Sequence, residues 1–165
     1  MRIFAVSGYS GTGKTTLIVA LIERLKKRGY TVSTVKSSME DSMPPEKSDT
    51  WKHLQAGARM SILQGPNSTT IRFTERISLS KTLQVYDSDF LLVEGMKGLA
   101  IPRFWCVGEG APEEVLPAGT VAIVVWKESA TTSKKADVPV MISDDVENLV
   151  KVVEQEALDV SDLVL

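Results

Sequence analysis

The sequence is poor in cysteine and histidine. Cys106 is its only cysteine and His53 is its only histidine. One cysteine cannot form an internal disulfide or a cysteine-rich zinc site, and a single histidine lacks the partners that a metal site needs. The sequence therefore excludes a disulfide scaffold and a zinc centre of this kind, and we expect a protein of the reducing cytoplasm.

Long apolar runs and a surplus of positive charge are also missing. The longest uninterrupted apolar runs, residues 17–22 and 121–126, contain six residues each, against the roughly 20 that cross a bilayer. The 19 basic residues are matched by 21 acidic ones, and the net charge of −2 creates no overall positive field for nucleic acid. We expect neither membrane insertion nor nucleic-acid binding.

What the sequence does contain is the composition of a folded domain. Hydrophobic residues make up 43% and charged residues 24% of the chain, which are ordinary values for a globular protein. A chain of 165 residues fits one domain. We therefore predict a single domain over residues 1–165.

Strand and helix patterns alternate along the chain. A β-prone apolar run at residues 2–6 is followed by a glycine-rich stretch and then by helical spacing at residues 15–28. A β-branched run at residues 31–36 completes a βαβ unit, which has a right-handed crossover and two parallel strands. Apolar runs at residues 90–93 and 120–126 are typical of strands that are buried on both faces.

The other expected elements lie between and after these runs. They are a helix capped by Asp49, strands at residues 60–63, 69–73 and 140–142, a helix at residues 79–85 and a closing helix at residues 144–158. This alternation predicts an α/β fold, a three-layer sandwich with a mainly parallel sheet, whose ligands bind at the carboxyl ends of the strands.

A glycine-rich motif lies between the first predicted strand and the first predicted helix. Residues 8–15, GYSGTGKT, match the pattern G-x-x-x-x-G-K-[ST]. In such a loop the glycines turn backbone N–H groups around phosphate oxygens, the helix adds its positive N-terminal dipole, the lysine suits the β- and γ-phosphates and the threonine hydroxyl suits Mg²⁺. The motif predicts a P-loop nucleotide site formed by Gly8, Ser10, Gly11, Thr12, Gly13, Lys14, Thr15 and Thr16.

Two acidic residues are candidates for binding a metal ion. Glu94 ends an apolar run at the edge expected to carry the loop, where a carboxylate holds Mg²⁺ directly or through water. The simpler interpretation is a solvated acid at a strand end. For Asp49, metal binding and plain helix capping stay equally open. The predicted metal set is Thr15, Asp49 and Glu94, and Lys14 and Glu94 are the residues expected to act in catalysis.

The tryptophans and arginines are weaker indicators of function than the glycine-rich motif. Trp51, Trp105 and Trp126 are more typical of packing than of base stacking. The sequence offers no assignable water-orienting glutamine and no clear arginine finger, which predicts slow hydrolysis of any bound nucleotide. Loose candidates for such an arginine are Arg59, Arg72, Arg76 and Arg103.

Four sequence blocks follow one another along most of the chain. They are GYSGTGKTTL, VKSS followed by KSDTWKHLQAGA, DFLLVEGMKGLAIPRF, and PVMISDDVENLVKVV. Their order resembles the MobB family of molybdopterin-guanine dinucleotide biosynthesis proteins. The resemblance implies a P-loop NTPase fold and a GTP-binding homodimer that hydrolyses GTP slowly with Mg²⁺. It also implies a partner, the guanylyltransferase that joins GMP to molybdopterin, and it puts Asp49 and Lys97 beside the nucleotide.

The chain departs from the patterns of this family and its relatives at three points. Family members commonly carry histidines after the lysine that ends the second strand, whereas Lys36 is followed here by Ser37, Ser38 and Met39. Position 9 is a tyrosine, so the second lysine of related dimeric ATPases is absent. An N-K-x-D block for guanine is absent too, and the preference for GTP over ATP stays open.

Two other functions compete with this one. A small-molecule kinase or ATP-dependent ligase of the dethiobiotin-synthetase type has a similar VEG block, and it predicts rapid use of ATP and a well-formed acceptor pocket. Against it, the sequence shows no arginine-rich lid. A GTPase that inserts metal into hydrogenase or urease ranks last, because one cysteine and one histidine are too few for its metal site.

Overall fold

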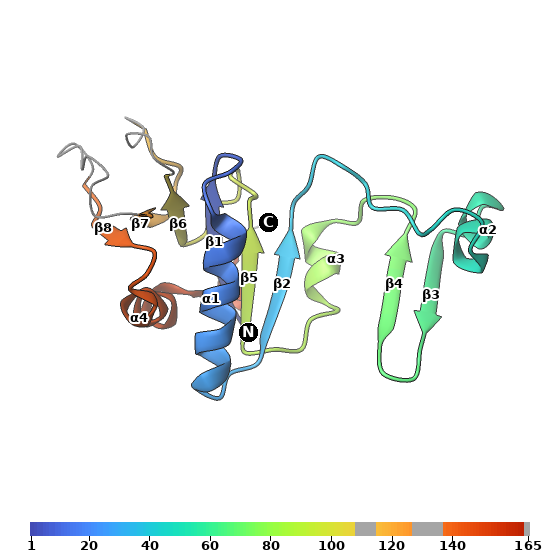
Figure 1. Ribbon diagram of the computed structural model, residues 1–165, viewed down its shortest axis with the longest axis horizontal. Coiled ribbons are helices and arrows are strands. Elements are labelled where there is room, and N and C mark those ends of the chain that lie inside the picture. Colours follow the sequence, from blue (N-terminus) through green and yellow to red (C-terminus); the bar gives the residue numbers. More distant parts are fainter. Residues whose placement is uncertain (108–114, 127–136, 164–165) are drawn as a thin grey trace. The chain divides into compact units, whose positions relative to one another are not determined.

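The structure, a computed structural model, describes residues 1–107, 115–126 and 137–163 (Figure 1). The chain divides into two compact units, one formed by residues 1–37 and 86–163 and the other by residues 38–85. A single domain over residues 1–165 stays a prediction. In the described part of the chain, no helix combines the length and the apolar character that a membrane-spanning helix requires.

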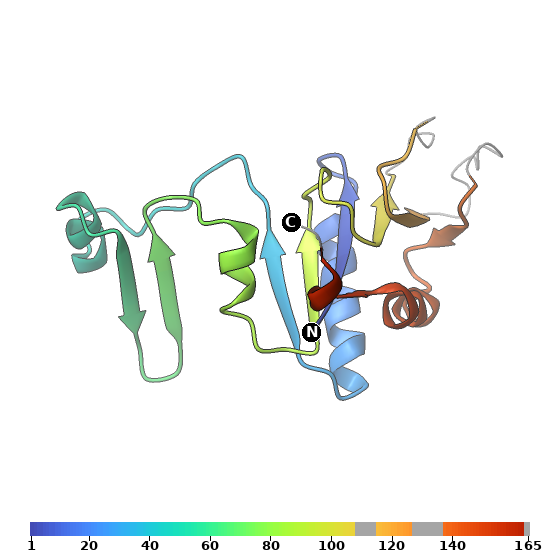
Figure 2. The ribbon, with the colours of Figure 1, turned by 180° about the vertical axis from the view of Figure 1, so that it is seen from behind.

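A mainly parallel sheet forms the centre of the first unit. Within the described residues it has seven strands, and β2, β5, β1, β6, β7 and β8 lie in this order, each parallel to its neighbours. β9, near the end of the chain, pairs antiparallel with the start of β1 (Figure 2). The predicted α/β fold with a mainly parallel sheet is confirmed. The bounds are β1 Arg2–Gly8, β2 Val32–Lys36, β5 Phe90–Glu94, β6 Arg103–Cys106, β7 Thr120–Val125, β8 Val140–Ile142 and β9 Leu158–Asp159.

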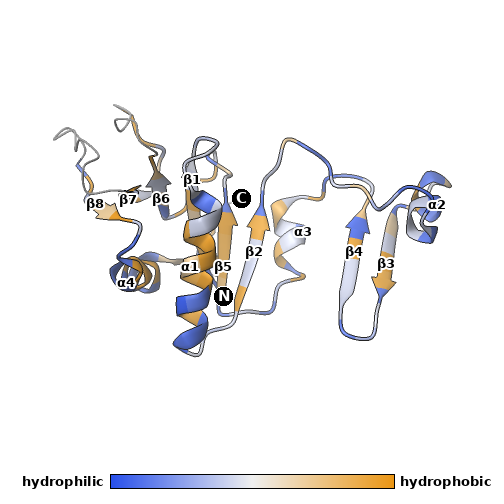
Figure 3. Cartoon of the chain, viewed as in Figure 1, coloured by the Kyte–Doolittle hydropathy of each residue, from blue (hydrophilic) through white to orange (hydrophobic). Residues whose placement is uncertain are grey.

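Two helices, α1 (Lys14–Lys27) and α4 (Val146–Glu156), contribute to the main core of this unit. Leu21 and Leu25 of α1 are fully buried in the same cluster as Phe104 of the sheet. Helical spacing puts such residues on one stripe, and Figure 3 shows apolar ribbon in the middle of α1 and polar ribbon towards both ends. The buried residues of α1 extend from Leu17 to Leu25, so the helix packs against the core along most of its length.

The central strand β6 was missed by the sequence analysis. It lies between β1 and β7, but its four residues are too few to show a period and its first residue is an arginine. The closing helix begins at Val146, later than predicted, because Asp145 is its N-cap and accepts a hydrogen bond from the Asn148 N–H at 3.4 Å. It ends at Glu156 because the following residues extend and pair with β1.

Gly119, just before β7, is expected to tolerate no side chain. It has a φ of 79°, and an added Cβ would lie 2.2 Å from the carbonyl oxygen of Ile101. Gly119→Ala is therefore expected to lower the free energy of unfolding by about 2 kcal/mol or more, measured by urea denaturation. Gly29 is the matched control, because it has a φ of 90° and open space around it. Equal losses in the two variants would contradict the predicted clash.

The second unit contains two short helices and a hairpin. The strands predicted at residues 60–63 and 69–73 are present and pair antiparallel. Ser48 is the N-cap of α2, because its Oγ accepts a hydrogen bond from the Trp51 N–H at 3.2 Å. Asp49 is the first helical residue, so the capping role expected of Asp49 is wrong. The bounds are α2 Asp49–Gln55, β3 Met60–Gln64, β4 Thr69–Phe73 and α3 Leu79–Leu83.

Candidate functional site

The loop between β1 and α1 has the backbone of an anion site. Gly11 and Gly13, with φ of 75° and 76°, adopt the left-handed conformation that glycine accepts without strain. Gly13 is the N-cap of α1, and no side-chain hydrogen bond caps this end of the helix in the structure as described. The N–H groups of the first helical turn, from Lys14 onward, are therefore available to an anion.

Three side chains hold the loop in this shape. Thr12 Oγ1 donates a hydrogen bond to the carbonyl oxygen of Tyr9 at 2.9 Å, and the Lys14 ammonium donates to the same oxygen. Trp126 Nε1, from the end of β7, donates to the carbonyl oxygen of Thr12 at 2.8 Å. The Lys14 ammonium thus lies against the loop, and the motif predicts that this ammonium binds phosphate.

Thr15 and Glu94, which were predicted as metal ligands, meet at the edge of the sheet. Glu94 is the last residue of β5, and Thr15 Oγ1 donates to its Oε1 at 3.0 Å. Lys36, the last residue of β2, holds its Nζ 3.1 Å from the same oxygen. A hydroxyl and a carboxylate side by side are the oxygen ligands that Mg²⁺ combines with phosphate oxygens.

Lys36 is a site residue that sequence reasoning left out. It pairs directly with Glu94 across neighbouring parallel strands, and both residues are the last of their strands. The carboxyl ends of parallel strands meet at one edge, so the signal was present in the predicted strand bounds. Lys36 balances the charge of a carboxylate that is only 12% exposed.

Lys97 lies over two aromatic rings beside the loop. Its Nζ is 3.9 Å from the ring centroid of Tyr9 and 5.1 Å from that of Trp105. The two rings meet edge to face, with their centroids 5.9 Å apart. The negative faces of aromatic rings attract an ammonium group, so this pair holds Lys97 near the loop. The structure places Lys97 over Tyr9 of the loop, and its place beside a nucleotide stays a prediction.

Arg103 is buried beneath the turn that follows Glu94. Its Nη1 donates to Ser7 Oγ at 3.2 Å and to the carbonyl oxygen of Lys97 at 3.1 Å. Burial lowers the pKa of Arg103, and its Nε and Nη2 have no hydrogen-bond partner within the described ranges. The side chain ties the Lys97 segment to β1. This full burial does not suit the arginine finger for which Arg103 was a candidate.

Cys106 does not have the properties of a nucleophile. It is buried at the end of β6, and burial raises the pKa of its thiol to about 12. The thiol is therefore neutral at pH 7. The Cys106 carbonyl also explains the first glycine of the motif, because an added Cβ on Gly8 would lie 2.4 Å from that oxygen.

Asp49 and His53 belong to the second unit. The Asp49 carboxylate lies 3.1 Å from Lys52 Nζ, and its role as a metal ligand stays a prediction. His53 is exposed on α2. Within the residues that the structure describes, no group of three or more His, Cys, Asp and Glu side chains could hold a metal ion. The Thr15 and Glu94 pair fits Mg²⁺ only together with ligands from a bound phosphate.

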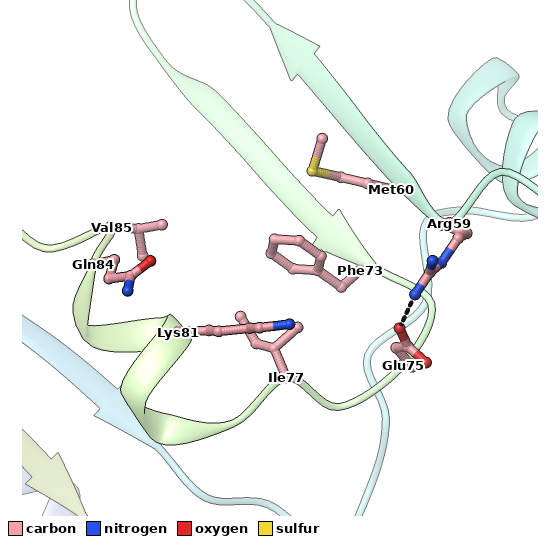
Figure 4. A pocket seen from close by; sticks show the side chains of 8 residues that line it. All are labelled: Arg59, Met60, Phe73, Glu75, Ile77, Lys81, Gln84 and Val85. Atoms are coloured by element: carbon pink, nitrogen blue, oxygen red, sulfur yellow. Dashed lines mark hydrogen bonds and ion pairs between the residues drawn. The ribbon is translucent and has the colours of Figure 1, made fainter.

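The second unit also has a pocket between the hairpin and the segment that carries α3. Its cavity measures about 500 Å³, and one rim carries an ion pair in which Arg59 Nη2 lies 2.6 Å from Glu75 Oε1 (Figure 4). This ion pair engages Arg59, another of the arginine-finger candidates. The lining residues are Arg59, Met60, Phe73, Glu75, Ile77, Lys81, Gln84 and Val85.

Sequence relatives share one family name. The family model described as MobB, molybdopterin guanine dinucleotide synthesis protein B, matches residues 3–127. A putative molybdopterin-guanine dinucleotide biosynthesis adapter protein of Methanocaldococcus jannaschii is 31% identical over 132 residues, 75% of this chain and 55% of that protein. This chain thus spans about half the length of that relative. The corresponding adapter protein of Escherichia coli is 30% identical over 159 residues, 89% of this chain and 88% of that protein.

Solved structures of MobB proteins share the fold of this chain. The crystal structure of Bacillus subtilis MobB superposes with a TM-score of 0.78 at 22% identity, covering 95% of this chain and 98% of that one. A MobB homologue from Bacillus stearothermophilus superposes with a TM-score of 0.69 at 22% identity, covering 94% and 97%. Because the family model matches well over half of the residues, this chain belongs to the MobB family.

Proposed function

We propose that this protein is a GTP-binding adaptor of molybdopterin guanine dinucleotide biosynthesis that hydrolyses GTP slowly. The single observation that carries the nucleotide part is the loop before α1, where two left-handed glycines and an uncapped helix end surround Lys14. The pathway is supported by the family and by relatives that are named adapter proteins. The proposed partner is the guanylyltransferase that joins GMP to molybdopterin.

Each group of site residues has its own proposed role. The N–H groups of the loop and of the first turn of α1, together with Lys14, would bind the β- and γ-phosphates. Thr15 and Glu94 would hold Mg²⁺, which withdraws charge from the phosphate oxygens when it is bound. Lys36 would balance the charge of the Glu94 carboxylate and hold it in place, and Lys97 would add a cation near the loop.

Slow hydrolysis is proposed because the sequence offers no clear arginine finger, and two arginines of the first unit do not suit that role. Arg103 is buried under a turn, and Arg28 pairs with Glu147 and Glu154 of α4. A supplied arginine is worth about 10³ to 10⁵ in rate. Turnover of GTP by the pure protein at ordinary kinase rates, roughly 1–100 s⁻¹, would contradict the adaptor proposal.

The Mg²⁺ site predicts the behaviour of Glu94→Gln. This variant keeps the shape of the side chain and its contact with Thr15, but it removes the negative charge. In Mg²⁺ we expect its GTP affinity to fall by about 10-fold, which corresponds to about 1.4 kcal/mol. Titration calorimetry with and without EDTA measures the effect. The same loss in EDTA would contradict a role in metal binding.

The hairpin supports the proposal of a homodimer. Cross-strand pairing puts Met60, Ile62, Ile71 and Phe73 on one face, and they are 39–52% exposed. Such a row of apolar side chains is typical of an interface. Light scattering is expected to give the mass of two chains for the native protein and of one chain for Ile62→Lys. Thr70→Lys on the opposite face is the control, and an unchanged mass in Ile62→Lys would contradict this interface.

Competition between GTP and ATP tests the nucleotide choice. The purified protein with Mg²⁺ is loaded with a fluorescent GTP analogue, which is then displaced by each nucleotide. Preferential displacement by GTP supports the proposal. Equal displacement removes the guanine assignment, and rapid ATP hydrolysis would favour the kinase or ligase alternative.

A further inference from the structure

Trp126 touches the phosphate loop from the end of a strand that the motif does not include. It follows β7 directly and is half-buried. Its indole Nε1 donates to the carbonyl oxygen of Thr12 at 2.8 Å. An added Cβ on Gly13 would lie 1.6 Å from the indole Cζ2 and 2.1 Å from Cε2. The indole ring is thus in direct contact with the backbone of Gly13 and leaves no space for a side chain there.

This contact fixes the orientation of one peptide group in the loop. In a planar trans peptide the C=O and the N–H point in opposite directions. Because the carbonyl of Thr12 points towards the indole N–H that donates to it, the N–H of Gly13 points away from the ring. Gly13 is the N-cap of α1, where N–H groups gather around an anion.

The other side-chain hydrogen bonds described in the loop do not orient the Thr12–Gly13 peptide. Thr12 Oγ1 and the Lys14 ammonium both donate to the carbonyl of Tyr9, at the start of the loop. Glycine itself permits several peptide orientations, since it lacks a Cβ. In the described part of the chain, the hydrogen bond from Trp126 is the side-chain contact recorded for the carbonyl of Thr12.

We propose that Trp126 is a positioning residue that presets the Thr12–Gly13 peptide so that the Gly13 N–H is ready to donate to a nucleotide phosphate. This inference rests on the proposed nucleotide binding. It gives Trp126 a role in orienting a phosphate-binding N–H group, whereas the sequence alone predicts that Trp126 only packs. Presetting matters because an ordered donor does not lose conformational entropy when the ligand binds.

The substitution Trp126→Phe tests the hydrogen bond. It keeps an aromatic ring against Gly13 and removes the N–H donor. We expect the affinity for Mg²⁺-GDP and for Mg²⁺-GTP to fall about 5-fold each, the size of one neutral hydrogen bond, because both ligands carry the β-phosphate. Trp51→Phe, in the second unit, is the matched control and should bind both nucleotides like the native protein.

A ¹H–¹⁵N NMR titration with Mg²⁺-GDP gives a readout that packing alone would not change. In the native protein we expect the Gly13 amide signal to shift strongly downfield at saturation and the Trp126 indole N–H to be protected from exchange. In Trp126→Phe the Gly13 shift should shrink. Native binding with an unprotected indole, or a variant whose affinity and Gly13 shift match the native protein, would overturn the inference. No binding by the native protein would overturn the proposed function as well.

Discussion

Lys14→Ala is expected to lower the affinity for Mg²⁺-GTP by about 100-fold or more. The ammonium lies against the loop, where its one described hydrogen bond is to the carbonyl of Tyr9. Hydrogen bonds that involve a charged group contribute about 1.5–3 kcal/mol each, and Lys14 would make one to the β- and one to the γ-phosphate. Their loss corresponds to at least two powers of ten in Kd. Titration calorimetry measures it directly.

The control for this prediction is Lys26→Ala. Lys26 is exposed in the last turn of the same helix, so its removal changes the net charge equally and leaves the loop untouched. We expect native affinity in this control. If Lys14→Ala bound GTP as tightly as Lys26→Ala does, Lys14 would have no part in phosphate binding and the assignment of the loop would fail.

Gly13→Ala is expected to weaken GTP binding strongly and to destabilise the fold. Gly13 has a φ of 76°, and a methyl group would overlap the indole of Trp126 at 1.6 Å. The strain of the left-handed backbone costs about 1–2 kcal/mol, and relief of the clash requires the loop or the indole to move. We expect a GTP affinity reduced at least about 100-fold, since several phosphate donors shift together. Calorimetry and urea denaturation measure the two effects.

Gly11→Ala separates the clash from the strain. Gly11 has a φ of 75°, and an added Cβ there meets nothing within 4 Å. This variant should carry the backbone strain alone and lose less stability than Gly13→Ala. The double variant Gly13→Ala with Trp126→Ala should recover part of the stability lost in Gly13→Ala. No recovery would mean that the indole is not the obstacle.

The elements that could be predicted from the sequence are those with a strong local pattern. The strand that ends at Glu94 is a continuous apolar run, and the helix after the glycine-rich loop has an apolar period, and each pattern reflects its burial. The glycine-rich loop is local as well, because its motif contains both the glycines and the lysine. The joining of Thr15 to Glu94 followed from placing both at one edge of a parallel sheet.

The features that escaped prediction depend on contacts between distant segments. Strand β6 is recognisable only from its place between β1 and β7, since it is short and begins with a buried arginine, Arg103. The contact of Trp126 with Thr12 joins residues 114 positions apart, and no spacing rule indicates it. The cap of α2 shifted by one residue because serine at position 48 and aspartate at position 49 are both good N-caps.

A crystal structure of the protein with Mg²⁺ and a non-hydrolysable GTP analogue tests the phosphate loop most directly. We predict that the β- and γ-phosphates lie within hydrogen-bond distance of the backbone N–H groups of residues 13–16 and of Lys14 Nζ. The Mg²⁺ ion should lie beside Thr15 Oγ1 and the Glu94 carboxylate. An analogue bound elsewhere on the protein, with nothing in this loop, would contradict the assignment.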